Sequence, residues 1–169
     1  GDVVKLVMPQ NASAPKGRLI QPQVVTLRNL LDKHALALCC APEELPQMLN
    51  TLKAPPSLII TDSQVFAQVQ SLTPKETKLT SFSVLMARHK GDIDSFREGA
   101  DALMALPANG KILIAEACSH IPQNEDIGRV KLPNMLRKKF GKELQIDIVS
   151  GNDFPEDLSQ YNLIIHCGA

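Results

Sequence analysis

The chain has 169 residues, 44% of them hydrophobic and 21% charged, which is the balance of a globular protein with one ordinary domain or two small ones. Its 18 basic and 18 acidic residues cancel, so no overall charge attracts nucleic acid, and we expect no nucleic-acid partner. No apolar run reaches the length of a transmembrane helix and no signal peptide opens the chain, so we expect no membrane association and a cytoplasmic location.

Short apolar runs alternate with helix-like segments through the first half of the chain. Strands are predicted at residues 3–8, 35–40, 57–61 and 78–80. The segments 22–34, 43–53 and 64–70 carry apolar residues at helical spacing. Strands and helices that alternate in this way form βαβ units with a mostly parallel sheet. We therefore predict a small α/β domain over residues 1–80.

The second half continues the alternation, from residue 81 to residue 169. Helices are predicted at 82–89, 92–104 and 133–140, and strands at 111–117, 144–149 and 161–165. In the second of these helices the apolar residues form one stripe, made of Ile93, Phe96, Ala100, Leu103 and Met104. The chain is thus predicted to be two small α/β domains in tandem, each with a mostly parallel sheet.

Two cysteines follow predicted core strands of the second domain, Cys118 after strand 111–117 and Cys167 after strand 161–165. If both strands lie in one parallel sheet, both cysteines emerge at its carboxyl edge, where open α/β sheets bind ligands. The period of two would also place Glu116, Cys118 and His120 on one face, if the chain stays extended. From these residues alone, metal ligands and buried strand-end thiols are equally compatible with the pattern.

Other residues have less specific interpretations. His166 should face away from Cys167, and we expect a core histidine there. Cys39 and Cys40 are expected to be strand residues that face opposite ways. Arg129 and Lys131 either offset the charge of a bound cluster or form a solvated basic loop.

The order of these residues resembles a known family. Cys118-x-His120, followed at the end of the chain by Cys167-Gly168-Ala169, is similar to the C-x-H…C-x-x-C signature of HydF, the GTPase scaffold of FeFe-hydrogenase maturation. Further segments that resemble the family lie along the whole chain, at residues 14–20, 61–64, 79–83, 114–118, 126–131 and 165–169.

The resemblance implies a 4Fe–4S cluster held by Cys118 and Cys167, with His120 or Glu116 as a weaker ligand of the iron that the thiolates leave open. It also implies a cargo, the two-iron precursor with its CO and cyanide ligands. That cargo would come from the radical SAM maturases of the pathway and pass to the apo FeFe-hydrogenase. Residues 1–80 would be the dimerisation domain of a homodimer, pairing through an edge strand, and residues 81–169 the cluster-binding domain.

The chain departs from the family pattern in two places. The signature ends in a third cysteine, which would follow Ala169, and the P-loop pattern G-x-x-x-x-G-K-[ST] of the family's GTP-binding module does not occur. We therefore expect an incomplete cluster site and no enzyme activity in this chain. Two alternatives stay open: a metal-free dimerisation fragment, and an α/β domain with structural zinc, which also accepts cysteine and histidine ligands.

Overall fold

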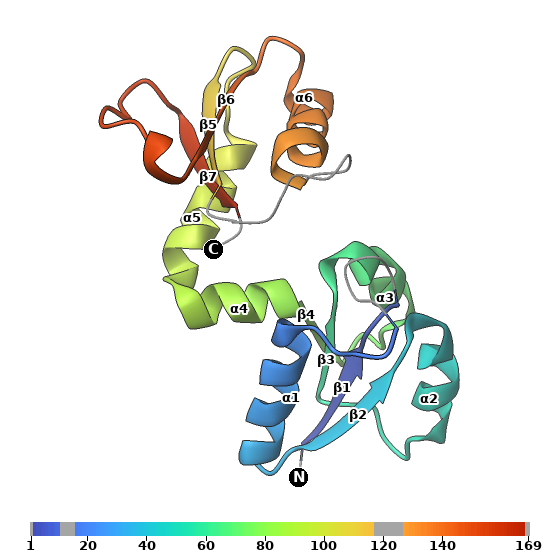
Figure 1. Ribbon diagram of the computed structural model, residues 1–169. Coiled ribbons are helices and arrows are strands. Elements are labelled where there is room, and N and C mark those ends of the chain that lie inside the picture. The colour runs from blue at the N-terminus through green and yellow to red at the C-terminus, as the bar shows by residue number, and fades with distance from the viewer. Residues whose placement is uncertain (1, 11–15, 117–126, 168–169) are drawn as a thin grey trace. The chain divides into compact units, whose positions relative to one another are not determined.

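The computed structural model describes residues 2–10, 16–116 and 127–167, and it divides the chain into two compact units, Gly1–Ile93 and Asp94–Ala169 (Figure 1). Each unit contains one parallel sheet with helices between its strands. The predicted class, two small α/β domains in tandem with parallel sheets, is confirmed.

The first sheet has four parallel strands in the order β2-β1-β3-β4. The strands are β1 (Val3–Val7), β2 (Leu36–Cys40), β3 (Leu58–Thr61) and β4 (Lys78–Ser81). The helices are α1 (Gln21–Asp32), α2 (Leu45–Thr51), α3 (Phe66–Leu72) and α4 (Phe82–Lys90). Short 3-10 turns, Pro42–Glu44 and Ser63–Val65, precede α2 and α3.

Two apolar clusters, one on each face of this sheet, show which helices cover which face. Val4 and Leu6 of β1 belong to a cluster with Leu27 of α1 and Leu85 of α4. Val7 belongs to the other cluster, with Leu45 of α2 and Val69 of α3. Because successive side chains of a strand point to opposite faces, α1 and α4 cover one face and α2 and α3 the other (Figure 1).

The boundary between the units differs from the predicted one at residues 80 and 81. Helix α4 belongs to the first unit, because Phe82 at its start is only 1% exposed and lies in the core cluster on the α1 face. The Ser81 hydroxyl accepts a hydrogen bond from the Val84 N–H at 3.2 Å, which caps α4 directly at the end of β4. The strand and the helix are therefore continuous parts of one fold, and the division falls after α4.

The second sheet has three parallel strands in the order β6-β5-β7, with β5 (Lys111–Glu116) between β6 (Gln145–Ser150) and β7 (Leu163–Cys167). Its helices are α5 (Ile93–Met104) and α6 (Leu132–Phe140); α6 follows a π-helical turn at Ile127–Lys131, and a 3-10 turn at Gly151–Asp153 follows β6. Ile112 and Ile114 of β5 pack with Leu136 of α6 in the core of this unit. Cys167 is the last residue of β7, whereas the sequence placed it after the strand.

The helices are short in the part of the chain that the structure describes. None of them is long and apolar enough to cross a membrane.

Candidate functional site

The three strands of the second sheet end in polar or sulfur-containing residues at one edge. Glu116, Ser150 and Cys167 are the last residues of β5, β6 and β7. Glu116 is in register with Ser150 on one side and with Cys167 on the other. Paired residues of neighbouring strands point to the same face, so the three side chains form a row at the carboxyl edge. The expectation that β5 and the strand of Cys167 adjoin in one parallel sheet is confirmed.

Glu116 is the centre of a hydrogen-bond network at this edge. Its Oε2 accepts hydrogen bonds from Arg129 Nε and from the Ser150 hydroxyl, each at 2.9 Å, and lies 2.8 Å from Arg129 Nη2 in an ion pair. Arg129 Nη2 also donates to the Ser150 hydroxyl at 2.8 Å. The side chain of Glu116 is only 5% exposed, and burying an unpaired carboxylate is costly. The ion pair with the guanidinium of Arg129 therefore offsets part of the free-energy cost of burying the Glu116 carboxylate.

The second carboxylate oxygen of Glu116 is different. Oε1 is buried, and among the described residues it has no hydrogen-bond partner. Buried acceptors without a partner are rare in native proteins, and each one needs an explanation. A hydrogen-bond donor or a metal ion that approached this edge would find Oε1 available, while Oε2 is already bonded to Arg129 and Ser150.

Two of the predicted ligands, Cys118 and His120, lie outside the described residues. Cys167 is described and half-buried on the face that packs against α6. Among the described residues, no group of three or more histidines, cysteines or carboxylates could hold a metal ion. The ligand roles of Cys118, His120, Glu116 and Cys167 therefore stay predictions.

Ser150 was not singled out from the sequence, although a signal existed. It is a polar residue at the carboxyl end of an apolar strand, which is the same criterion that identified Cys118 and Cys167. Arg129 had two interpretations, and its contacts with Glu116 and Ser150 show a third role, the ion-pair partner of a buried acid.

The expectation of a core histidine at residue 166 is wrong. His166 is exposed, and Ile164, two residues earlier on the same face of β7, is 41% exposed. The side chains of an edge strand that face away from the helix-covered core are only partly covered, which explains the exposure of both residues.

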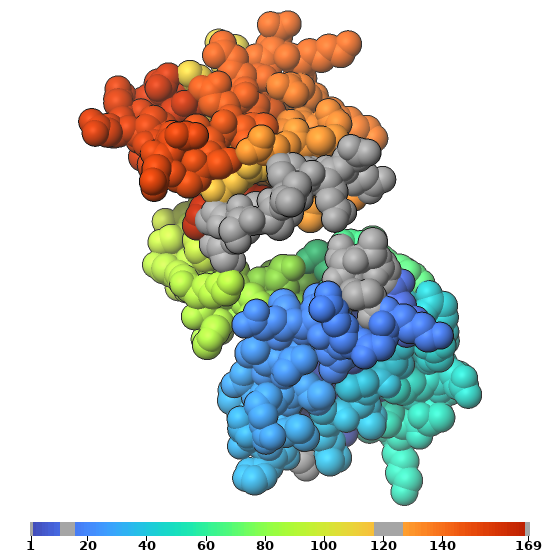
Figure 2. Space-filling model, viewed as in Figure 1, coloured from blue at the N-terminus to red at the C-terminus, as the bar shows by residue number. Residues whose placement is uncertain are grey.

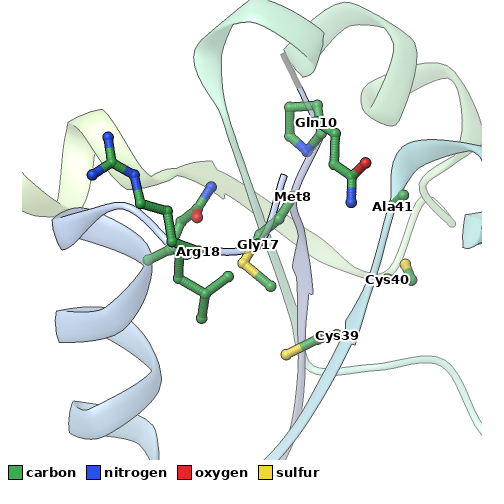
Figure 3. A pocket seen from close by; sticks show the side chains of 10 residues that line it. Met8, Gln10, Gly17, Arg18, Cys39, Cys40 and Ala41 are labelled. Carbon is green, nitrogen blue, oxygen red and sulfur yellow. The ribbon is translucent and has the colours of Figure 1, made fainter. Parts of the chain in front are cut away.

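The first unit has a hollow at the carboxyl ends of β1 and β2, with a volume of about 450 Å³ (Figure 3). Its lining consists of Met8, Pro9, Gln10, Gly17, Arg18, Leu19, Gln23, Cys39, Cys40 and Ala41. Cys39 and Cys40 are on β2, as expected, and the guanidinium of Arg18 points away from both. Burial raises the pKa of both thiols above their ordinary value of 9.0, so at neutral pH they are protonated and weak nucleophiles.

Lys5 lies in the middle of β1. Its side chain is completely buried, and Nζ has no hydrogen-bond partner among the described residues. Burial lowers the pKa of Lys5 below its ordinary value of 10.5, and the thiol of Cys40 works in the opposite direction. A buried lysine with no carboxylate partner among the described residues lowers the stability of the first unit.

Comparison with known families covers nearly the whole chain. Residues 1–91 match the family model described as the hydrogen maturase F dimerization domain. Residues 94–169 match the model described as the hydrogen maturase F tetramerization domain. The two matches meet where the structure divides into its two units. No curated protein matches the chain in a sequence search.

Proposed function

Because this chain belongs to the hydrogen maturase F (HydF) family, we propose that it is a scaffold in FeFe-hydrogenase maturation that binds a 4Fe–4S cluster. The two-iron precursor with its CO and cyanide ligands is its cargo. The radical SAM maturases supply this cargo, and the apo-hydrogenase receives it. The matched regions are described as oligomerisation domains, so the role proposed for this chain is binding and transfer rather than turnover.

The observation that carries the proposal is the row of strand ends at the carboxyl edge of the second sheet. Glu116 and Cys167 are in register on neighbouring strands, which are about 4.8 Å apart in a sheet. Cys118 follows Glu116 by two residues, and two residues of chain span at most about 7 Å. The short chain distance between Glu116 and Cys118 supports the proposal that Cys118 and Cys167 bind one cluster.

The donor set suits an iron–sulfur cluster. Thiolates are the usual ligands of such clusters, and a site with fewer than four of them leaves one iron open to an exchangeable group. Glu116 Oε1 is the described acceptor nearest in the chain to Cys118 and has no hydrogen-bond partner among the described residues, which supports it as a weak, replaceable ligand. The positive charge of Arg129 beside it would offset part of the negative charge of a thiolate-bound cluster.

The first unit would form the dimer interface, through pairing of an edge strand. Strands β2 and β4 form the two edges of its sheet. Strand β2 has the sequence Leu-Ala-Leu-Cys-Cys without a charge, and its first residue, Leu36, is 60% exposed. Strand β4 begins with Lys78, and lysine at an edge opposes strand pairing. We therefore propose β2 as the strand that pairs across a two-fold axis.

Anaerobic reconstitution with iron and sulfide tests the cluster. The chain is used in a version continued through the third cysteine of the family pattern. We expect about four irons per chain and, after reduction, the EPR signal of a 4Fe–4S cluster. Replacing Cys118 or Cys167 by alanine should remove most of the iron and the signal. Cys39→Ala, which removes an exposed thiol of the first unit, is the matched control and should change neither.

Three results would contradict the proposal. Uptake of one zinc per chain with no iron–sulfur signal would favour the structural zinc site. Binding of neither metal, in a chain that still self-associates, would favour the metal-free dimerisation fragment. Equal iron content in wild type and Cys118→Ala would also contradict it, because the iron would then be bound elsewhere.

A further inference from the structure

Ser150 connects the two side chains that hold the buried carboxylate of Glu116. Its hydroxyl donates to Glu116 Oε2 at 2.9 Å and accepts from Arg129 Nη2 at 2.8 Å. Arg129 Nε donates to the same Oε2 at 2.9 Å. The three side chains therefore form a closed ring of hydrogen bonds, in which each member is held by the other two. We call Arg129 and Ser150 the Glu116 clamp.

The members of this ring come from three different elements of the second unit. Glu116 ends the central strand β5, and Ser150 ends the neighbouring strand β6 in register with it. Five of the six residues of β5 are buried, and its yellow atoms occupy only small areas of the face seen in Figure 2. Arg129 lies on the π-helical turn before α6. Side chains that are held on strands are placed more precisely than side chains on loops, so the clamp has a firm base at its strand members.

Both members of the clamp contact the same oxygen of Glu116. Oε2 is bonded to Arg129 and Ser150, whereas Oε1 is buried and has no hydrogen-bond partner among the described residues. Rotation of the carboxylate to exchange its two oxygens would break the hydrogen bonds of Oε2. Hydrogen bonds to a charged group are among the stronger ones in proteins. The clamp therefore fixes which oxygen of Glu116 stays available.

We propose that Arg129 and Ser150 are positioning residues, which hold Glu116 so that Oε1 alone is available to the open iron of the cluster. This inference rests on the proposed function and assigns two further residues to its exchangeable site. Carboxylates that bind metals are themselves hydrogen-bonded by outer partners, and loss of such a partner typically lowers metal affinity about 10- to 100-fold. A carboxylate that offers one oxygen is also a harder ligand than a thiolate, so an incoming group can replace it.

Competition by imidazole, an exogenous ligand of iron, measures how firmly Glu116 holds the open position. The reconstituted chain of the cluster experiment is titrated with imidazole, and the EPR spectrum of the reduced protein is followed. Glu116→Gln gives the affinity for imidazole when the carboxylate is lost. Ser150→Ala removes one donor of the clamp, and imidazole should bind about tenfold more tightly than to wild type. Arg129→Lys keeps the charge but loses the two-pronged contact, and it should act in the same direction.

Two serine variants separate positioning from a general effect on the fold. Ser150→Thr keeps the hydroxyl and should bind imidazole as wild type does. Ser159→Ala, at an exposed serine of the same unit, should also leave the affinity unchanged. The melting temperature and the iron content of every variant are measured on the same samples. A clamp with a purely structural role would lower the melting temperature of Ser150→Ala and leave its imidazole affinity unchanged, which would overturn the inference.

Other outcomes would also overturn it. Equal imidazole affinity of wild type and Glu116→Gln would mean that Glu116 does not hold the open position. An effect of Ser150→Thr as large as that of Ser150→Ala would mean that the hydroxyl does not position Glu116. If the samples still carry about four irons and the 4Fe–4S signal, these results overturn this inference alone. A wild-type chain without a cluster overturns the proposed function, and this inference with it.

Discussion

The carboxylate of Glu116 and the guanidinium of Arg129 meet at 2.8 Å, although thirteen positions separate the two residues in the sequence. The ion pair joins the last residue of β5 to the π-helical turn that precedes α6. Cys118 and His120 lie between these two residues in the sequence. The contact therefore fixes the two described residues that flank the predicted cluster ligands in the chain.

Replacing Arg129 by alanine should destabilise the second unit. Among the described residues, the substitution leaves the buried Glu116 carboxylate with only the Ser150 hydroxyl as a donor. Because Arg129 is itself 47% exposed, we expect a loss of about 2 kcal/mol rather than the larger cost of a fully buried pair. Urea denaturation followed by circular dichroism measures this loss.

The matched control for that change is Arg97→Ala. Arg97 pairs with Asp101 on the surface of α5, with both side chains more than two-thirds exposed, so its loss should cost less than about 0.5 kcal/mol. The double variant Glu116→Gln with Arg129→Ala should cost clearly less than the sum of the two single changes, since both remove the same contact. Additive losses would mean that the ion pair contributes nothing to the fold.

Lys5→Met should stabilise the first unit at neutral pH. Lys5 is completely buried, and burial lowers its pKa. Folding therefore costs free energy, either because a charged ammonium group is buried or because its proton must be removed. Methionine has a similar length and no charge, and we expect a gain of about 1–2 kcal/mol in the free energy of unfolding. Thermal unfolding of the two proteins at pH 7 measures the difference.

The same pair of proteins gives a pH test. A lysine whose pKa is lowered on folding binds fewer protons when folded, so the stability of the wild type rises with pH between the folded pKa and the ordinary value of 10.5. Taking the difference between wild type and Lys5→Met cancels the titration of the other groups, apart from the coupling of Lys5 to Cys40. The advantage of the methionine should therefore shrink as the pH approaches 10.5. An advantage that does not change with pH would contradict a lowered pKa.

Gln23→Leu should weaken the junction of α1 and β3. The Gln23 side chain is 1% exposed; its Oε1 accepts from the Ile20 N–H at 3.1 Å, and its amide donates to Asp62 Oδ2 at 3.0 Å. Leucine removes both bonds and leaves Asp62, whose pKa is already raised by burial, without this donor. We expect a loss of about 1–3 kcal/mol at pH 7, measured by urea denaturation. Gln21→Leu, at an exposed position two residues earlier, should change stability by less than about 0.5 kcal/mol.

The loss in Gln23→Leu should depend on pH. A carboxyl whose pKa is raised on folding binds more protons when folded, so its contribution to stability is present at low pH and is lost as the pH rises through the folded pKa. Without the Gln23 amide the pKa of Asp62 rises further. The difference between Gln23→Leu and wild type should therefore be smaller near pH 4 than at pH 7. A larger difference at pH 4 would contradict the role given to this hydrogen bond.

Two Gly→Ala changes in the second unit should have opposite effects. A Cβ at Gly110, before β5, would lie 2.5 Å from Leu106 Cδ2 and 3.0 Å from the carbonyl oxygen of Pro107, so we expect a loss of about 1–2 kcal/mol. A Cβ at Gly99, inside α5, would meet nothing within 4 Å, and alanine there should add up to about 1 kcal/mol of helix stability. Thermal unfolding distinguishes the two, and a destabilising Gly99→Ala would show that α5 is packed at that position.

The strands and most helices of this chain could be predicted from apolar spacing, because local periodicity reflects which side of an element is buried. The boundary at residue 80 was misplaced for a related reason. The local pattern shows where α4 begins and ends. It does not show whether Phe82 packs in the core of the first or the second unit, because that depends on the tertiary packing of the α1 face of the first sheet. The prediction for His166 failed for the same reason, because the local pattern does not show that β7 is an edge strand.

The sequence by itself determined the fold class, the parallel arrangement of the strands, and a position for Glu116 and Cys167 close to the carboxyl ends of two strands of the second domain. It did so because strand ends and side-chain alternation are local properties of the chain. Only the tertiary structure decided that Ser150 and Arg129 share the carboxylate of Glu116, 34 and 13 positions away. Those contacts depend on the order β6-β5-β7 and on where the turn before α6 returns to the sheet, which no local pattern encodes.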